Sequence, residues 1–161
     1  MKNRYLIYKV DNITSLVDET IYLSDNLILT GELEIYYETD QEVVVDNNKL
    51  IKVGDKEVRY NKNNQIAIID GYMLHYEDDV LFAIYGSPET YHFIYKDNVL
   101  VQVGEYKIRY YKEGFVDGIF KSGDNKENEF LKKYHERLDK FLSIEEEAEE
   151  ELEELKKIDH D

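Results

Sequence analysis

Apolar and polar residues alternate along the first three quarters of the chain in short runs, which turn-forming residues separate. The clearest run occurs twice, as LIKVGDKEVRY at 50–60 and as LVQVGEYKIRY at 100–110. In each copy an apolar strand leads to a Gly and then to a second, strictly alternating strand, which is typical of a β-hairpin. Gly54 and Gly104 supply the positive φ that a tight turn requires. We therefore predict that both copies are hairpins that turn at these glycines.

Looser versions of this unit extend over residues 5–121. Each has an apolar strand that ends in Tyr, a polar turn and a second apolar strand. The Tyr positions are Tyr8, Tyr22, Tyr37, Tyr60, Tyr76, Tyr95 and Tyr110. Most are about 15 residues apart, the length of two strands and two tight turns. We expect an antiparallel meander of about 12–14 short strands, which closes into a barrel or splits into two packed sheets because an open twisted sheet rarely holds so many.

The alternation also predicts which side chains are buried. In residues 105–110, Tyr106, Ile108 and Tyr110 should face the core while the charged residues between them face water. Residues 57–60 repeat this pattern. The single Pro lies in residues 87–90, where we expect an irregular loop.

Past Gly123 the period of the apolar residues changes from that of a strand to that of a helix. Asp124 and Glu127 form a capping box, which predicts a helix start. The following apolar residues fall on heptad positions: Leu131, Tyr134, Leu138, Phe141, Ala148, Leu152 and Leu155. A second capping box begins at Ser143, so one helix over about 125–158 and two helices broken at Ser143 both remain open.

The predicted fold is therefore mainly β with a C-terminal α segment. A β-meander domain takes residues 1–123, and an acidic amphipathic helical tail takes residues 124–161. We expect residues 130–142, which carry the larger aromatics, to pack on the β domain. The Glu-rich half should meet a partner.

The meander resembles Tyr-marked β-meander repeats, of the YD type in RHS proteins or of the MORN and YwqK type. Residues 58–66, VRYNKNNQI, carry this resemblance most closely. The resemblance implies a style of repeat and names no function.

Charge limits the classes of partner. The formal net charge is −16; residues 124–161 hold 15 acidic and 7 basic residues, so the tail and the first 123 residues each carry −8. Such a chain repels nucleic acid and anionic membranes. The N-terminal residues lack the apolar run of a signal peptide, and no stretch approaches the ~18 apolar residues of a membrane helix. The absence of Cys fits a reducing compartment, so we expect a cytoplasmic location.

The strongest candidate contact surface is the Glu-rich stretch at 145–154. We assign partner binding to Glu145, Glu146, Glu147, Glu149, Glu150, Glu151, Leu152 and Leu155. Dense carboxylates attract a basic protein surface or reproduce the field of nucleic-acid phosphates. A solvated acidic helix face is the simpler interpretation.

For four other groups of residues we prefer a structural role to a functional site. His75 and His92 are placed to pair across a hairpin but lack a third metal ligand, so we interpret them as half-exposed strand residues. Arg59 and Arg109 recur at equivalent positions and should pair across strands with Glu or Asp. The Tyr series should pack in the core and not form a platform for bases. Residues 46–48 and 97–98 lack the remaining positions of a calcium loop and should be turns.

These patterns favour a non-enzymatic protein-interaction or assembly module, without cofactor or metal, that binds a partner with a basic surface through the β domain and the acidic helix. Self-association through that helix is a further expectation. One alternative is an acidic nucleic-acid mimic of the anti-defence kind, which inhibits a nucleic-acid-binding protein. Another is a β-barrel that holds a small apolar ligand between Tyr side chains.

Overall fold

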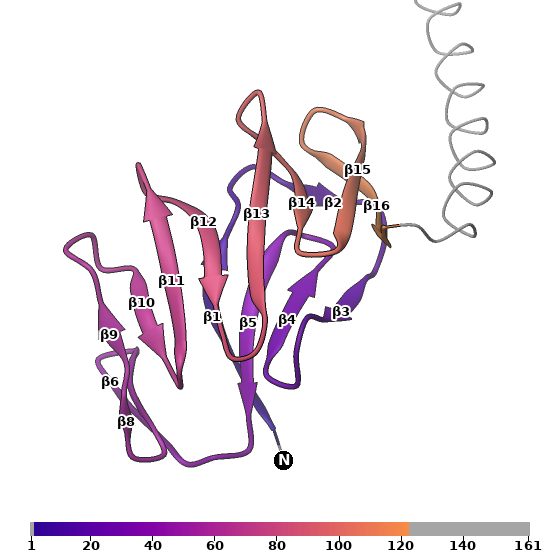
Figure 1. Ribbon diagram of the computed structural model, residues 1–161. Coiled ribbons are helices and arrows are strands. Elements are labelled where there is room, and N and C mark those ends of the chain that lie inside the picture. Colours follow the sequence, from indigo (N-terminus) through magenta and orange to yellow (C-terminus); the bar gives the residue numbers. More distant parts are fainter. Residues whose placement is uncertain (1, 123–161) are drawn as a thin grey trace, which may run out of the picture. The chain divides into compact units, whose positions relative to one another are not determined.

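The computed structural model describes residues 2–122, which fold into strands joined by turns (Figure 1). The strands form three sheets, which are antiparallel apart from one parallel pair. The prediction of a mainly β meander is confirmed. The predicted C-terminal helix and the partner-binding residues assigned to it lie outside the described residues.

The first sheet has four strands in the order β1-β5-β4-β3. Their bounds are β1 Asn3–Lys9, β3 Thr20–Tyr22, β4 Leu27–Thr30 and β5 Glu34–Thr39. The inward side chains of β4 and β5 include Leu27, Leu29, Ile35 and Tyr37, all nearly or fully buried. This sheet brings β1 beside β5, so that Tyr5 lies opposite Tyr37.

The second sheet has nine strands, in which β9 to β16 follow chain order and β2 is added in parallel beside β16 (Figure 1). The bounds are β2 Thr14–Ser15, β9 Arg59–Tyr60, β10 Ile66–Ile69, β11 Tyr72–Glu77, β12 Val80–Tyr85, β13 Thr90–Lys96, β14 Val99–Val103, β15 Tyr106–Lys112 and β16 Phe115–Lys121. The expected Pro-containing loop joins β12 to β13, and its Ser87–Pro88 bond is cis. No helix within residues 2–122 has the length and apolarity of a membrane span.

The third sheet continues the same meander in three strands. Its bounds are β6 Val43–Asp46, β7 Lys49–Val53 and β8 Lys56–Glu57. Only Val58 separates β8 from β9, and its N–H still donates to the Ile51 carbonyl at 2.9 Å. The predicted alternative of a closed barrel is wrong, because the sheets of the described residues end in separate edge strands. Three open sheets take the place of the two that we expected.

The two copies of the repeat form matching hairpins. Val53 pairs with Lys56 in one copy, and Val103 pairs with Tyr106 in the other, so each loop has two residues. Gly54 has a φ of 57° and stands first in its loop, as a type II′ turn requires. Gly104 has a φ of 56° at the equivalent place. The predicted hairpins and their turn positions are confirmed.

Replacing either loop glycine with Val is expected to lower the free energy of unfolding by more than ~1 kcal/mol, because a β-branched residue is strained at positive φ. A Cβ at Gly104 would also lie 3.3 Å from Cδ1 of Tyr91. Urea denaturation measures the loss. The matched control is Gly104→Asn, since Asn tolerates this conformation. Equal midpoints for the Val and Asn variants would contradict the strain argument.

Four other hairpins turn at pairs of residues that both have positive φ. The pairs are Asn47-Asn48, Asp78-Asp79, Asp97-Asn98 and Asp70-Gly71. Two consecutive positive φ values define a type I′ turn, which matches the twist of the flanking strands and favours Asn, Asp and Gly. The predicted assignment of the calcium-like sequences to turns is confirmed.

Alternation places side chains as the sequence predicts. In β15, Ile108 is buried, Tyr106 and Tyr110 are half-buried, and Lys107 and Arg109 are exposed. Val58 and the equivalent residues of the other strands join one continuous apolar core.

The strand register gives the residues of the following strand that lie opposite the repeated arginines. Arg59 of β9 stands opposite Ile68, and Arg109 of β15 stands opposite Gly118. Neither opposite residue carries a carboxylate, and the pairing of these arginines with Glu or Asp stays a prediction. Each arginine therefore has an uncharged residue opposite it in the following strand, Ile68 in β10 and Gly118 in β16.

Candidate functional site

A cleft of about 1360 Å³ runs beside strand β1. Residues 4–11 form one wall of this cleft, which we call the β1 cleft. The ends of successive hairpins form the other wall: residues 47–50, 64–66 and 76–80, with Tyr95 and Asn98. The cleft therefore lies along a strand, and the turns and adjoining strand residues of successive hairpins line its far wall.

β1 is a sheet edge of unusual length in this fold. Among residues 2–122, the edge strands of the three sheets are β1, β3, β2, β9, β6 and β8. β1 has seven residues, and the other five have two to four. Short edges are a common protection against pairing with other chains. β1 lacks that protection, and the cleft lies along it.

The directions of the N–H groups can be followed at the end of β1. The Val10 N–H donates to the Leu33 carbonyl at 3.2 Å, on the β5 side. N–H directions alternate along a strand, so the N–H of Lys9 points away from β5. That donor is directed to the side of β1 on which a further strand would add.

Tyrosines at the predicted repeat positions form the inner wall of the cleft, and their hydroxyls bind the backbone. Tyr60, Tyr76 and Tyr95 line the cleft, and Tyr110 continues the series beyond it. The bonds are Tyr60 to the Leu50 carbonyl at 2.7 Å, Tyr76 to Ile66 at 2.8 Å, Tyr95 to Leu81 at 2.8 Å and Tyr110 to Leu100 at 2.5 Å. Each hydroxyl thus satisfies a carbonyl of an earlier strand, and the rings pack against the core as predicted.

Burial raises the pKa of all four phenols above their ordinary value, and that of Tyr110 reaches about 12. The cause is desolvation, which penalises the phenolate. These hydroxyls therefore remain neutral donors at physiological pH. They hold strands together and are not available as catalytic bases.

Aromatic contacts seat β1 against the nine-stranded sheet. The ring of Tyr8 lies 6.2 Å from that of Tyr76 and 6.3 Å from that of Phe93, the latter edge to face. Such pairs contribute beyond their buried area. They fix the distance between β1 and the hairpins that form the opposite wall.

Polar contacts tie neighbouring hairpin ends to each other along the rim. Lys49 Nζ lies 3.8 Å from the centroid of the Tyr60 ring and donates to the Asn64 side chain. One hairpin further on, Gln65 donates to the carbonyl of Asp79 at 3.0 Å, and Asn63 donates to its carboxylate. Side-chain contacts therefore join the hairpin ends of the far wall to one another.

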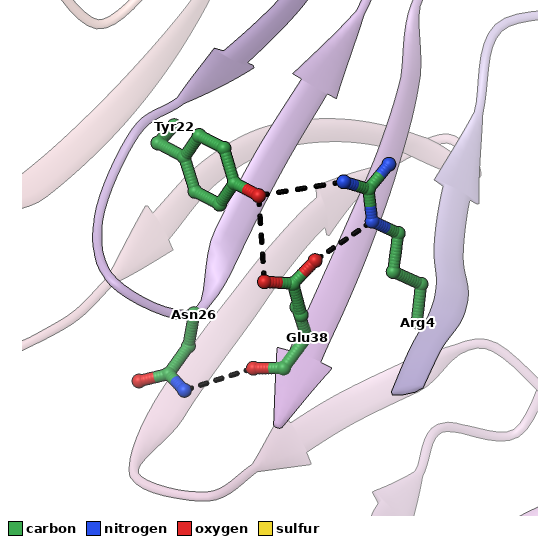
Figure 2. A network of polar contacts seen from close by, with 4 residues as sticks. All are labelled: Arg4, Tyr22, Asn26 and Glu38. Atoms are coloured by element: carbon green, nitrogen blue, oxygen red, sulfur yellow. Dashed lines mark hydrogen bonds and ion pairs between the residues drawn. The ribbon is translucent and has the colours of Figure 1, made fainter. Parts of the chain in front are cut away.

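The outer face of the four-stranded sheet holds β1 in place through a polar network (Figure 2). Arg4 Nε donates to Glu38 Oε2 at 2.7 Å, and Tyr22 reaches across β4 so that its hydroxyl lies 3.4 Å from both Arg4 Nη2 and Glu38 Oε1. Asn26 Nδ2 donates to the Glu38 carbonyl at 2.9 Å. Glu38 is 6% exposed, and Arg4 is the cation that pairs with its carboxylate. This network joins β1, β3 and β5.

The structure separates the two histidines that the sequence placed as neighbours. His75 of β11 and His92 of β13 both lie opposite Ala83, which belongs to the strand between them. Pairing across one hairpin is therefore wrong. Both are exposed, and within residues 2–122 no group of three potential ligands is arranged to hold a metal ion.

Sequence reasoning missed the edge position of β1 and, outside the cleft, a buried carboxylate. The edge position of β1 depends on its pairing with β5, about 30 residues away in the chain, and hydrophobic alternation does not specify partners. Asp117 is fully buried within a run of four buried residues in β16, whereas alternation predicts that every second residue is exposed. The assigned partner-binding residues at 145–155 lie outside the described part of the chain.

Comparison with known proteins was made at three levels. No family model, no curated protein and no solved structure matches this chain. The resemblance to Tyr-marked repeats therefore stays a prediction. The geometry of the β1 cleft is the observation from which a function can be argued.

Proposed function

We propose that this protein is a non-enzymatic protein-interaction module, which binds an extended segment of a partner protein as an added strand beside β1. The β1 cleft carries this proposal, because it joins the longest sheet edge among residues 2–122 to a tyrosine-lined wall. Strand addition supplies affinity through main-chain hydrogen bonds, and the pockets for alternate side chains supply specificity.

The dimensions of the cleft suit a peptide better than a small molecule. Pockets for small ligands commonly have volumes of about 300–1,000 Å³, and this cleft has about 1360 Å³. A strand rises about 3.3 Å per residue, so a partner segment as long as β1 spans about 20 Å or more. One face of that segment would meet the rings of Tyr60, Tyr76 and Tyr95.

In this proposal the partner is also contacted by the acidic C-terminal segment, in addition to the β1 cleft. The residues assigned to that contact lie outside the described residues, so their role stays a prediction from the sequence. They are Glu145, Glu146, Glu147, Glu149, Glu150, Glu151, Leu152 and Leu155. The β1 cleft and this segment make separate contributions, and each can be tested by its own variants.

Removing the outward N–H of Lys9 is expected to weaken peptide binding. Random peptides of about twelve residues, long enough to span β1, are selected by phage display on the immobilised full chain. A recovered peptide is then titrated against Lys9→Pro, which deletes that donor on the edge side. We expect affinity to fall at least about tenfold, as the loss of a main-chain hydrogen bond with an unsatisfied partner predicts.

The matched control is Lys9→Ala, which removes the same side chain and keeps the N–H. It should bind within about threefold of the original chain. Circular dichroism and urea midpoints establish that both variants are folded. Equal binding by Lys9→Pro and Lys9→Ala would contradict strand addition, and so would a selection that enriches no peptide.

A further inference from the structure

Each basic residue of the β1 cleft has a carboxylate or an aromatic ring as a neighbour in the fold. Arg4 is bound to Glu38 on the outer face of the sheet, at 2.7 Å. The three pairs are Arg4 with Glu38, Lys9 opposite Glu34 in the β1–β5 register, and Lys49 over the Tyr60 ring. The Glu38 carboxylate therefore offsets the charge of Arg4, and Glu34 lies opposite Lys9, so the positive charge along β1 is accompanied by negative charge of its own sheet.

The negative charges of the acidic residues in the cleft have fewer positive charges close to them. Glu77, Asp78 and Asp79 form one hairpin end on the far wall, and all three are exposed. The carboxylate of Asp79 accepts a hydrogen bond from the neutral amide of Asn63, and Glu77 lies 3.5 Å from the imidazole of His75. Neither contact supplies the permanent charge of a Lys or Arg.

This acidic turn lies beside the C-terminal half of β1. Tyr76, which precedes the turn, contacts Tyr8 with a ring separation of 6.2 Å. Asp11 follows β1 at the same end of the cleft wall. The first 123 residues also carry a net charge of −8, so the field of the whole domain has the same sign as this end of the cleft.

We propose that the segment which adds beside β1 is basic, with Lys or Arg on the side chains that meet the turn at residues 77–79. This inference rests on the proposed function and specifies the chemistry of its partner. Side chains of a strand alternate between two faces. The expected segment therefore has apolar residues that pack on the tyrosines, in alternation with basic residues that face the acidic turn.

The charge of the selected peptides tests this inference. Peptides of about twelve residues recovered on the full chain should be enriched in Lys and Arg, with apolar residues at alternating positions. The double variant Glu77→Gln with Asp78→Asn should bind a recovered peptide about fivefold more weakly at low salt, the effect expected of two rim charges. The loss should shrink as salt is added.

The matched control is Asp55→Asn with Glu57→Gln, which removes two exposed acids outside the cleft wall. It should leave the affinity unchanged. This comparison is needed because the full chain also carries the acidic C-terminal segment, which attracts basic peptides to both variants equally.

Peptides that are neutral or acidic, or equal binding by the two double variants, would overturn the basic partner. If such peptides still lost affinity with Lys9→Pro, strand addition would stand and only its charge preference would fail. If selection enriched no peptide, both the proposed function and this inference would fail.

Discussion

Raising the pH above about 10 is expected to unfold the β domain, because its buried tyrosines resist ionisation while those of the unfolded chain ionise near pH 10. Burial raises the pKa of Tyr110 to about 12, and burial together with a hydrogen bond to Glu89 raises that of Tyr91 to about 12. Burial also raises the pKa of Tyr37, Tyr76 and Tyr95.

The sign of the effect follows from proton counting. Between about pH 10 and 12 the unfolded chain has released tyrosine protons that the folded chain still holds, so stability falls as pH rises. Each such tyrosine adds up to about 1.4 kcal/mol per pH unit to the slope. A phenolate also cannot donate, so ionised Tyr76 would face the Ile66 carbonyl with two acceptors in contact.

Urea denaturation at a series of pH values from about 8 to 11 measures this slope, and ultraviolet absorbance follows tyrosinate formation. Tyr110→Phe removes one titrating group, so its alkaline slope should be shallower although it is less stable near neutrality. Tyr85→Phe, which removes a phenol that is 43% exposed, is the control. Free energies of unfolding that do not change across this range would contradict the buried donor role of the tyrosines.

Replacing Asp70 with Ala is expected to cost about 2–4 kcal/mol, a large part of the stability of a domain this size. The side chain of Tyr37 is fully buried, and its hydroxyl donates to the Asp70 carboxylate. Gln41 donates to the same carboxylate at 3.2 Å, and Lys56 lies 3.5 Å from its other oxygen. The change leaves a buried hydroxyl without its acceptor and places Ala at a φ of 43°.

Two further variants separate these causes. Asp70→Asn retains an acceptor oxygen and tolerates positive φ, so it should cost less than Asp70→Ala. Tyr37→Phe removes the donor instead. In a double-mutant cycle, the combined Tyr37→Phe and Asp70→Ala variant should be more stable than the sum of the single losses predicts. Strict additivity of the two losses in urea denaturation would contradict the proposed coupling.

The meander itself was predictable because its signals are local. Gly54 and Gly104 mark turns because Gly adopts positive φ without strain, and alternation in residues 105–110 distinguishes buried from exposed side chains. The Tyr positions were also recognisable, and their packing in the core was expected. Their hydroxyl acceptors were not, because a carbonyl carries no sequence signal.

The candidate site depended on contacts that local patterns do not encode. The β1 cleft exists because β1 pairs with β5 and leaves its other edge beside the hairpin ends. The acidic turn at residues 77–79 reads in the sequence as an ordinary hairpin loop. Its position near Tyr8 follows from tertiary packing of residues almost 70 positions apart. Sequence reasoning therefore assigned partner binding to the acidic residues of the tail and missed the acidic residues of the cleft.

The parallel pairing of β2 with β16 has a consequence for synthesis on the ribosome. Thr14 donates to the Gly114 carbonyl at 2.8 Å and Leu16 to that of Val116 at 2.7 Å, so these contacts span about 100 residues. The four-stranded sheet is complete once Thr39 has emerged. β2 must wait for β16, and contacts of such long range slow folding. The nascent chain therefore contains every strand of the four-stranded sheet long before β2 can pair, and β2 stays without its neighbour until almost the whole domain has been made.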